Sequence, residues 1–276
     1  MAARCRSWCA AHALRRPSRR DPGSMPRRAD ADPDDASLGS VDPRLHPPMR
    51  FPDADWAWFL VRCTALGIAG ADARRPLLET LYGHLHGVNR WLNLTKLTTV
   101  RDYLKLHVLD SLAAVPDARF RHLAEGAPCA DLGSGGGYPG LPLAAWSPRI
   151  PWFLIDARRK KAEFLAAAGP LTGNPACTGA HLRGGDGARD PRLHRRCQLV
   201  TSRAMAETVE CMREAAPLLR RHGHLMVWKG PAFAAEERPA VNAACAQYGW
   251  RLVAERPHRL EESDPERVLV VLERLE

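Results

Sequence analysis

The ten residues 131–140 read Asp-Leu-Gly-Ser-Gly-Gly-Gly-Tyr-Pro-Gly, and this stretch decides the fold. It follows a short apolar run and precedes a segment, residues 141–146, that is compatible with a helix. Glycine lacks a Cβ atom, so it permits a sharp turn and lets a ligand approach the backbone closely. The opening of the next helix should also offer unpaired N–H groups to a ligand. The pattern predicts a nucleotide-type site at the C-terminal end of a parallel strand.

The identity of the nucleotide has two readings. Gly135, Gly137 and Gly140 spell G-x-G-x-x-G, the dinucleotide fingerprint, so an NAD-dependent oxidoreductase is an alternative. Asp131 argues against it, because a carboxylate there would repel a pyrophosphate but could accept a hydrogen bond from a cationic amino group. The form D-x-G-x-G-x-G is similar to motif I of class I S-adenosylmethionine methyltransferases. We therefore expect Asp131, Gly133, Ser134 and Gly135 to bind S-adenosyl-L-methionine.

Composition limits the class of protein. The chain has 276 residues, 45% of them hydrophobic, which suits one or two domains with a proper core. No apolar run approaches the roughly 18 residues of a membrane span, so no membrane partner is expected. The eight cysteines are scattered without zinc spacing, which predicts no metal site and reduced thiols in a cytoplasmic protein. The net charge of +9 is compatible with an RNA partner and equally with a solvated basic surface.

Three regions are expected along the chain. Residues 1–47 are rich in Arg, Pro and Asp without apolar periodicity, which predicts a disordered tail. A transit peptide, a later start at Met25 or Met49, and an RNA-contacting arm are alternative readings of it. Residues 48–125 carry apolar side chains at helical spacing and form a predicted helical cap. Residues 126–276 form a predicted methyltransferase domain.

The domain 126–276 alternates strand-like and helix-like segments. Its last two strand-like runs, 250–254 and 267–272, have no helix between them, which implies an antiparallel pair. The predicted fold class is α/β: a Rossmann-like, mostly parallel sheet with a terminal antiparallel β-hairpin, preceded by the helical cap. Strands are also expected at 127–132, 152–156, 178–182, 198–202 and 223–228.

Asp156 is the second candidate for cofactor binding. It lies 19 residues beyond Gly137, at the end of a five-residue apolar strand. An acid in this place can hold the two ribose hydroxyls of an adenosine. It can equally cap the helix that starts near Arg158, and both roles are compatible.

The catalytic candidates follow later strands. After the fourth strand the sequence is Thr201-Ser-Arg203-Ala, without the tetrapeptide typical of amino-group methyltransferases. Cys129 precedes the glycine loop, on the first strand, and is assigned to the core rather than to a nucleophile. A ring nitrogen with a free lone pair, such as N7 of guanine, needs neither a nucleophile nor a base, only correct positioning. Arg203 and, after the fifth strand, Lys229 are the expected catalytic residues.

Five motifs in the same order then resemble one family, the small-subunit ribosomal RNA methyltransferase G family, also called glucose-inhibited division protein B. The resemblance covers about residues 77–272. The motifs are Asn93-Leu-Thr95 with Arg101, His107-Val-Leu-Asp110-Ser111-Leu112, the glycine loop from Asp131, Asp156-Ala-Arg-Arg-Lys160-Lys161 with Phe164-Leu165, and Ser202-Arg203-Ala204 with Lys229-Gly230.

The resemblance implies methyl transfer from S-adenosylmethionine to N7 of guanine-527 in 16S rRNA. By motif, Gly133 and Tyr138 fall on cofactor-contact positions, Arg203 lines the site, and Ala188 with Arg189 fall on the adenine-contacting pair. Partners are expected to be 16S rRNA or the 30S subunit, with the protein acting as a monomer.

Two segments need separate interpretation, residues 187–190 and residues 107–111. Residues 187–190 read Gly-Ala-Arg-Asp where the family carries an Arg-Val/Ala-Glu-Glu type segment. This departure keeps open a non-catalytic RNA-binding protein on a degenerate methyltransferase fold. His107, Asp110 and Ser111 lie within five residues of one helix, with no nucleophile elbow, so they are expected to brace the cap over the site or to contact RNA rather than to form a hydrolytic triad.

Overall fold

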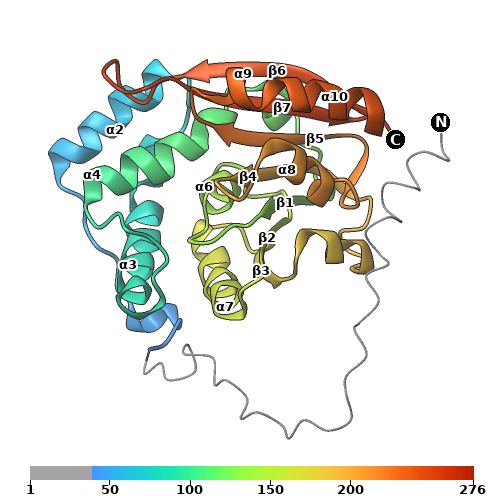
Figure 1. Ribbon diagram of the computed structural model, residues 1–276. Helices are drawn as coiled ribbons and strands as arrows, with labels where there is room; N and C mark the ends of the chain where they lie inside the picture. The colour runs from blue at the N-terminus through green and yellow to red at the C-terminus, as the bar shows by residue number, and fades with distance from the viewer. Residues whose placement is uncertain (1–38) are drawn as a thin grey trace, which may run out of the picture. The chain divides into compact units, whose positions relative to one another are not determined.

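The computed structural model describes residues 39–276 (Figure 1). The chain divides into two compact units, Met1–Ser40 and Val41–Glu276, and the second is described below. The part of the expected tail at residues 1–38 lies outside the described residues.

The predicted cap consists of helices, as its apolar spacing indicates. Proline stands at the first or second position of α3, where its missing N–H costs nothing and its fixed φ suits a helix. The elements are η2 (Pro43–Leu45), α2 (Asp53–Ala65), η3 (Asp72–Arg74), α3 (Arg75–Leu92), α4 (Val100–Asp102), η4 (Tyr103–Leu109), η5 (Leu112–Ala114) and α5 (Ala118–Arg121).

The second part of the unit is a seven-stranded sheet with helices between its strands. Residues 238–248 form a helix that the sequence reading did not assign. The elements are β1 (Cys129–Leu132), α6 (Gly140–Trp146), β2 (Trp152–Asp156), α7 (Arg159–Ala168), η6 (Gly169–Thr172), β3 (Cys177–His181), η7 (Gly184–Arg189), β4 (Cys197–Arg203), α8 (Thr208–Ala215), β5 (Leu219–Lys229), α9 (Phe233–Glu236), α10 (Arg238–Tyr248), β6 (Trp250–His258) and β7 (Arg267–Arg274).

The strand order is β3-β2-β1-β4-β5-β7-β6. Strands β1 to β5 pair in parallel, whereas β7 pairs antiparallel with both β5 and β6. The predicted fold class is therefore confirmed, including the terminal hairpin. The last strand of the chain lies inside the sheet, between β5 and β6, which the sequence pattern alone did not place.

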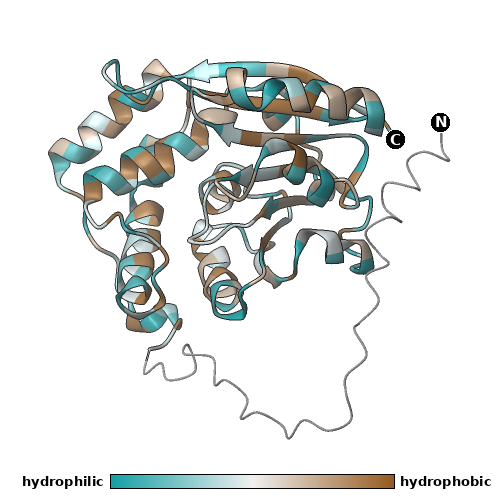
Figure 2. Cartoon of the chain, in the orientation of Figure 1, coloured by the Kyte–Doolittle hydropathy of each residue, from teal (hydrophilic) through white to brown (hydrophobic). Residues whose placement is uncertain are grey.

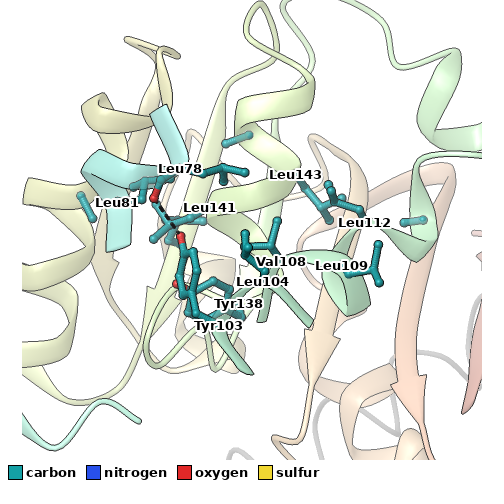
Figure 3. Packing of buried hydrophobic residues seen from close by; sticks show 14 of the residues in the cluster. Leu78, Leu81, Tyr103, Leu104, Val108, Leu109, Leu112, Tyr138, Leu141 and Leu143 are labelled. Carbon is teal, nitrogen blue, oxygen red and sulfur yellow. Dashed lines mark hydrogen bonds between the residues drawn. The ribbon is translucent and has the colours of Figure 1, made fainter. Parts of the chain in front are cut away.

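The cap and the sheet share one hydrophobic core. A single cluster of buried side chains runs from Phe51 through the cap helices to Val271 on β7. Figure 3 shows side chains of α3 and η4 packed against those of the glycine loop and α6, and Figure 2 shows hydrophobic residues on both the cap helices and the strands. The predicted boundary at residue 125 therefore does not separate two cores. Among the described residues, no helix combines the length and apolarity that crossing a bilayer demands.

The cap begins with a strap, residues 41–51, that lies along α3. His84 Nε2 donates to the carbonyl of Val41 (2.8 Å), and the carboxylate of Glu79 accepts from the N–H of Phe51 (2.9 Å). Residues 41–47 were expected to belong to a disordered tail, but η2 and these contacts make them part of the folded unit. The sequence carried no signal for this segment, because the strap is bound through backbone groups. Such binding does not require apolar side chains at regular spacing.

Two glycines of α3 make room for the strap. A Cβ atom on Gly83 would lie 2.1 Å from the carbonyl oxygen of Pro47, and one on Gly87 would lie 2.1 Å from Nδ1 of His46. The first obstacle is backbone, whereas the second is a side-chain ring. A chain that started at Met49 would lack Pro47 and His46, which occupy the space beside Gly83 and Gly87.

We expect Gly83→Ala to destabilise the fold by about 1–3 kcal/mol, because the strap backbone must move. Gly87→Ala is the matched control and should be less destabilised than Gly83→Ala, since alanine favours the helix by about 1 kcal/mol and the obstacle is a side chain rather than backbone. Urea unfolding measures both free energies. Equal stabilisation of both variants would show that the strap is not held at Gly83.

Candidate functional site

A cleft of about 340 Å³ lies at the C-terminal ends of β1, β2 and β4. The strand order reverses between β1 and β4, and such a switch point is where open α/β sheets bind ligands. The sequence-predicted residues Gly133 and Asp156 are among those that line it. The lining also includes Leu132, Ile155, Ala157, Arg158, Leu182, Arg183, Met205, Ala206, Glu210 and Glu214.

Asp131, on β1, organises the glycine loop beside this cleft. Its carboxylate is fully buried, and Oδ2 accepts from Ser134 Oγ (2.6 Å) and from the N–H of Gly140 (3.0 Å). Oδ1 accepts from Thr201 Oγ1 on β4 (2.8 Å). These contacts differ from the expected contact with a ligand amino group, because the donors come from the protein itself. The carboxylate ties both ends of the loop to the neighbouring strand.

Burial raises the pKa of Asp131 to about 6, although its hydrogen bonds favour the charged form. A carboxylate without water is costly unless it is hydrogen-bonded, which explains why three donors converge on it.

The glycines of the loop allow neighbouring side chains to pack directly against its backbone. Gly133 has φ +66°, in the left-handed region, and a Cβ atom there would lie 2.8 Å from Cγ of Met205. A Cβ atom on Gly140 would lie 2.3 Å from the side chain of Leu154. The N–H groups of Gly135 and Gly140 donate to Asp156 and Asp131. The expectation that the opening of the next helix offers unpaired N–H groups is therefore wrong at Gly140, the first residue of α6.

Asp156 ends β2 and is 8% exposed. Its Oδ2 accepts from the N–H of Gly135 (3.0 Å) and its Oδ1 from the N–H of Arg158 (2.8 Å). The second bond turns the chain just before α7, but the N-cap residue of this helix is Arg158 and it makes no side-chain cap bond, so the expected role of Asp156 as the helix cap is not borne out. Each carboxylate oxygen can accept a further hydrogen bond, so the exposed edge can still bind hydroxyl groups in the cleft.

Tyr138 packs the glycine loop against the cap. Its buried ring stacks on the ring of His107 at 4.2 Å and 5° and meets the edge of Tyr103 at 6.2 Å. The guanidinium of Arg203 lies 5.7 Å from the Tyr138 ring centroid. The loop residue predicted to contact the cofactor is thus packed mainly against the cap.

His107 links this aromatic stack to Arg203. Burial and the nearby Arg203 charge lower the pKa of His107 to about 3, so its ring is neutral at physiological pH. A guanidinium only donates, so Nδ1 of His107 accepts from Arg203 (3.3 Å) and Nε2–H donates to Thr95 Oγ1 (2.8 Å). The hydrogen bonds therefore select one tautomer.

Arg203 reaches from the end of β4 to the cap. Its Nη1 donates to the carbonyl of Leu106 (2.7 Å) and to Asp110 Oδ2 (2.9 Å), and its side chain is 15% exposed. The π-helical turn η4 brings these acceptors together, since the N–H of Asp110 bonds the carbonyl of Lys105, five residues earlier. Such turns often occur at functional sites.

Asp110 accepts from donors on four strands, through its carboxylate on three of them and through its carbonyl on the fourth. Besides Arg203, it faces His258 Nε2 (3.4 Å) at the end of β6 and Arg267 Nη1 (3.3 Å) at the start of β7, while its carbonyl accepts from Trp228 Nε1 (2.7 Å). Burial opposes its charge, yet the hydrogen bond from His258 and the two arginines lower its pKa. The expectation that this helix braces the cap agrees with these contacts.

Ser111 bonds its own helix, since its Oγ donates to the carbonyl of His107 at 2.5 Å.

Lys229 was expected to be a second catalytic cation, and the structure places its ammonium in an ion pair. Nζ lies 2.8 Å from Glu237 and donates to the carbonyl of Ala206 (2.9 Å), with the side chain 11% exposed. These contacts use the charge to hold the turn after β4.

Ala188 and Arg189 do not line the cleft, so their predicted adenine contact lacks support in the geometry. The chain passes the cleft at Leu182 and Arg183 and then turns away in η7. Within η7, a Cβ atom on Gly187 would lie 2.2 Å from a side-chain atom of Leu218. Leu218 directly precedes β5, so it lies at the N-terminal ends of the parallel strands, away from the cleft. The two predicted residues are exposed on this return path.

Two residues near the loop were not identified from the sequence. Thr201 is fully buried, but its strand offered no contrast that would single out its bond to Asp131. β4 also carries the polar side chains of Gln198, Ser202 and Arg203. Nothing in the sequence marks Met205, because its position depends on the backbone of Ala204, whose φ is +55°.

We expect Asp131→Asn to keep the loop, since the amide oxygen can accept in place of Oδ2 and its NH₂ can donate to Thr201. The folded pKa of about 6 exceeds the ordinary value of 3.8. The wild-type carboxyl therefore stabilises the fold fully below about pH 3.8, and this contribution is lost as pH rises through about 6. The free energy of unfolding of the variant relative to wild type should rise by up to about 3 kcal/mol between those limits.

Urea unfolding across this pH range measures the difference. Asp190→Asn is the control with the opposite sign, because the hydrogen bond from Arg192 lowers the pKa of Asp190. A difference for Asp131→Asn that does not change with pH would contradict the assignment of a costly buried charge.

Known proteins of one family are similar to this chain. Residues 74–254 match the family described as rRNA small subunit methyltransferase G. Proteins named ribosomal RNA small subunit methyltransferase G are 31% identical in Myxococcus xanthus (210 residues, 76% of this chain and 92% of the relative) and 34% identical in Cupriavidus necator (220 residues, 76% and 90%). The relative from Geobacter sulfurreducens is 34% identical over 205 residues, 74% of this chain and 91% of its own length. The chain belongs to the rRNA small subunit methyltransferase G family.

Proposed function

We propose that this protein transfers a methyl group from S-adenosylmethionine to N7 of a guanine in small-subunit ribosomal RNA. The cleft at the strand switch point carries the proposal, together with membership of the family. Family membership favours this reaction over the NAD-dependent and non-catalytic alternatives.

The residues of the cleft fit a nucleoside. Asp156 offers carboxylate oxygens for vicinal hydroxyls, Gly133 gives access to the backbone, and apolar side chains of Leu132, Ile155 and Leu182 suit the faces of an adenine. S-adenosylmethionine supplies a methyl group on a sulfonium, which a nitrogen lone pair can accept without a prior proton transfer. The protein needs only to hold the two reactants in line and to exclude water.

Arg203 is the proposed catalytic residue. Its guanidinium is fixed by Leu106, Asp110 and His107 and lies near the Tyr138 ring, and the side chain retains a small exposed part. A rigid planar cation in this place can stack on a guanine or bind its O6 and so orient N7. Lys229 is proposed to position the turn after β4 rather than to contact the base.

Methyl transfer tests the function directly. We expect labelled S-adenosylmethionine to modify 30S subunits or 16S rRNA that lack the modification, with the label on N7 of a single guanine. Tight binding of NAD(H) without binding of S-adenosylmethionine would favour the oxidoreductase. Salt-sensitive rRNA binding without cofactor binding would favour the non-catalytic protein.

Arg203→Lys should lower kcat by about 10- to 100-fold, since a single ammonium nitrogen cannot take the places of both Nη1 and Nη2 and the cation shifts. The Kd for S-adenosylmethionine should change much less, because the head of Arg203 lies against the cap. Single-turnover rates and calorimetry separate the two effects. Arg192→Lys, in an exposed arginine–aspartate pair with Asp190, is the matched control and should behave as wild type. Wild-type turnover in Arg203→Lys would remove this residue from the site.

A further inference from the structure

The turn that follows β4, residues 204–207, forms one wall of the cleft. Ala204 adopts φ +55°, a left-handed conformation that costs a residue with a Cβ atom about 1–2 kcal/mol. Such strain persists only where the surroundings impose it, and it concentrates at functional sites. Its effect here is to lay Met205 against Gly133, with both residues lining the cleft.

A partly buried ion pair holds the far end of this turn. Lys229 Nζ donates to the carbonyl of Ala206 (2.9 Å) and to Glu237 Oε1 (2.9 Å). The other carboxylate oxygen of Glu237 accepts from both the N–H and the Oγ1 of Thr208, each at 2.7 Å. Glu237 thereby joins the end of β5, the turn and the start of α8 in one set of contacts.

Lys229 and Glu237, with their contacts to Ala206 and Thr208, form a clamp on this turn, and their opposite charges compensate each other. Burial opposes the charge of Glu237, but the hydrogen bonds from Lys229 and Thr208 lower its pKa, so it is ionised at neutral pH. Removing either charge would leave the other partly buried without its partner, which is costly. The turn is therefore fixed more firmly than its exposed position at Ala204 suggests.

We propose that Glu237 is a positioning residue for S-adenosylmethionine: through Lys229 it holds Met205 against the glycine loop as a wall of the cofactor cleft. The inference rests on the proposed function, because it takes S-adenosylmethionine as the ligand of this cleft. Met205 touches the ligand, while Glu237 and Lys229 act through it. A thioether suits this wall, since it is apolar, polarisable and adapts to the shape of what it covers.

The variants separate positioning from catalysis and from simple stability. Glu237→Gln removes the charge while keeping the shape, Lys229→Met removes the bond to Ala206, and Met205→Ala removes the wall but leaves the clamp. Glu236→Gln is the matched control, since Glu236 is exposed and lies one residue earlier, at the end of α9.

Calorimetry with S-adenosylmethionine gives Kd, and single-turnover methylation of unmodified 30S subunits gives the rate at saturating cofactor. We expect Glu237→Gln, Lys229→Met and Met205→Ala each to weaken cofactor binding about 5- to 50-fold, with a smaller effect on the saturated rate. The double variant Glu237→Gln/Met205→Ala should bind no more weakly than the worse single variant, because both changes act on one wall. Glu236→Gln should match wild type.

Other results would overturn the proposal. Unchanged Kd in Glu237→Gln, even with a lower melting temperature, would make the clamp purely structural. Unchanged Kd with a reduced rate in Lys229→Met would make Lys229 catalytic instead. If Glu237→Gln does not fold, Met205→Ala and Lys229→Met decide by the same criteria. Wild-type protein that binds no S-adenosylmethionine would contradict the proposed function itself, a result distinct from failure of the variants alone.

Discussion

The site depends on the buried carboxylate of Asp131. It has no access to water, so its charge is tolerated only if donors surround it, and the nearest donors belong to the glycine loop and to β4. Satisfying this one group fixes both ends of the loop and the spacing of β1 and β4. The cleft between them follows, because Gly133 and the loop N–H that bonds Asp156 are then held in place.

A second buried carboxylate connects the cap to the sheet. Asp110 faces Arg203, His258 and Arg267, which come from three different strands, and the shared hydrophobic core presses the same elements together. Removing one partner of such a buried pair costs far more than the pair contributes, so the arrangement gives specificity of docking more than stability. The cap is consequently part of the site: it supplies the acceptors that orient the guanidinium.

Much of the fold followed from local pattern. The acid and alternate glycines, the apolar runs and the missing helix between the last two strands correctly predicted a parallel sheet with an antiparallel end. Helical spacing predicted the cap. The strap at residues 41–47 was missed, because its binding to α3 uses backbone groups and the absence of side chains at Gly83 and Gly87. The insertion of β7 between β5 and β6 was also beyond local pattern, since strand order depends on contacts between distant segments.

The sequence by itself determined which residues could end up at the C-terminal edge of the sheet, because strand ends and glycine positions are encoded locally: Asp131, Gly133, Asp156 and Arg203 all lie there. Only the tertiary structure decided what each one touches. Whether a carboxylate faces a ligand or the protein's own N–H groups depends on which donors the packing brings within about 3 Å. For that reason Asp131 bonds the loop, Lys229 pairs with Glu237, and Ala188 and Arg189 leave the cleft. The linear pattern was compatible with a catalytic role for Lys229 and with cofactor binding by the other three.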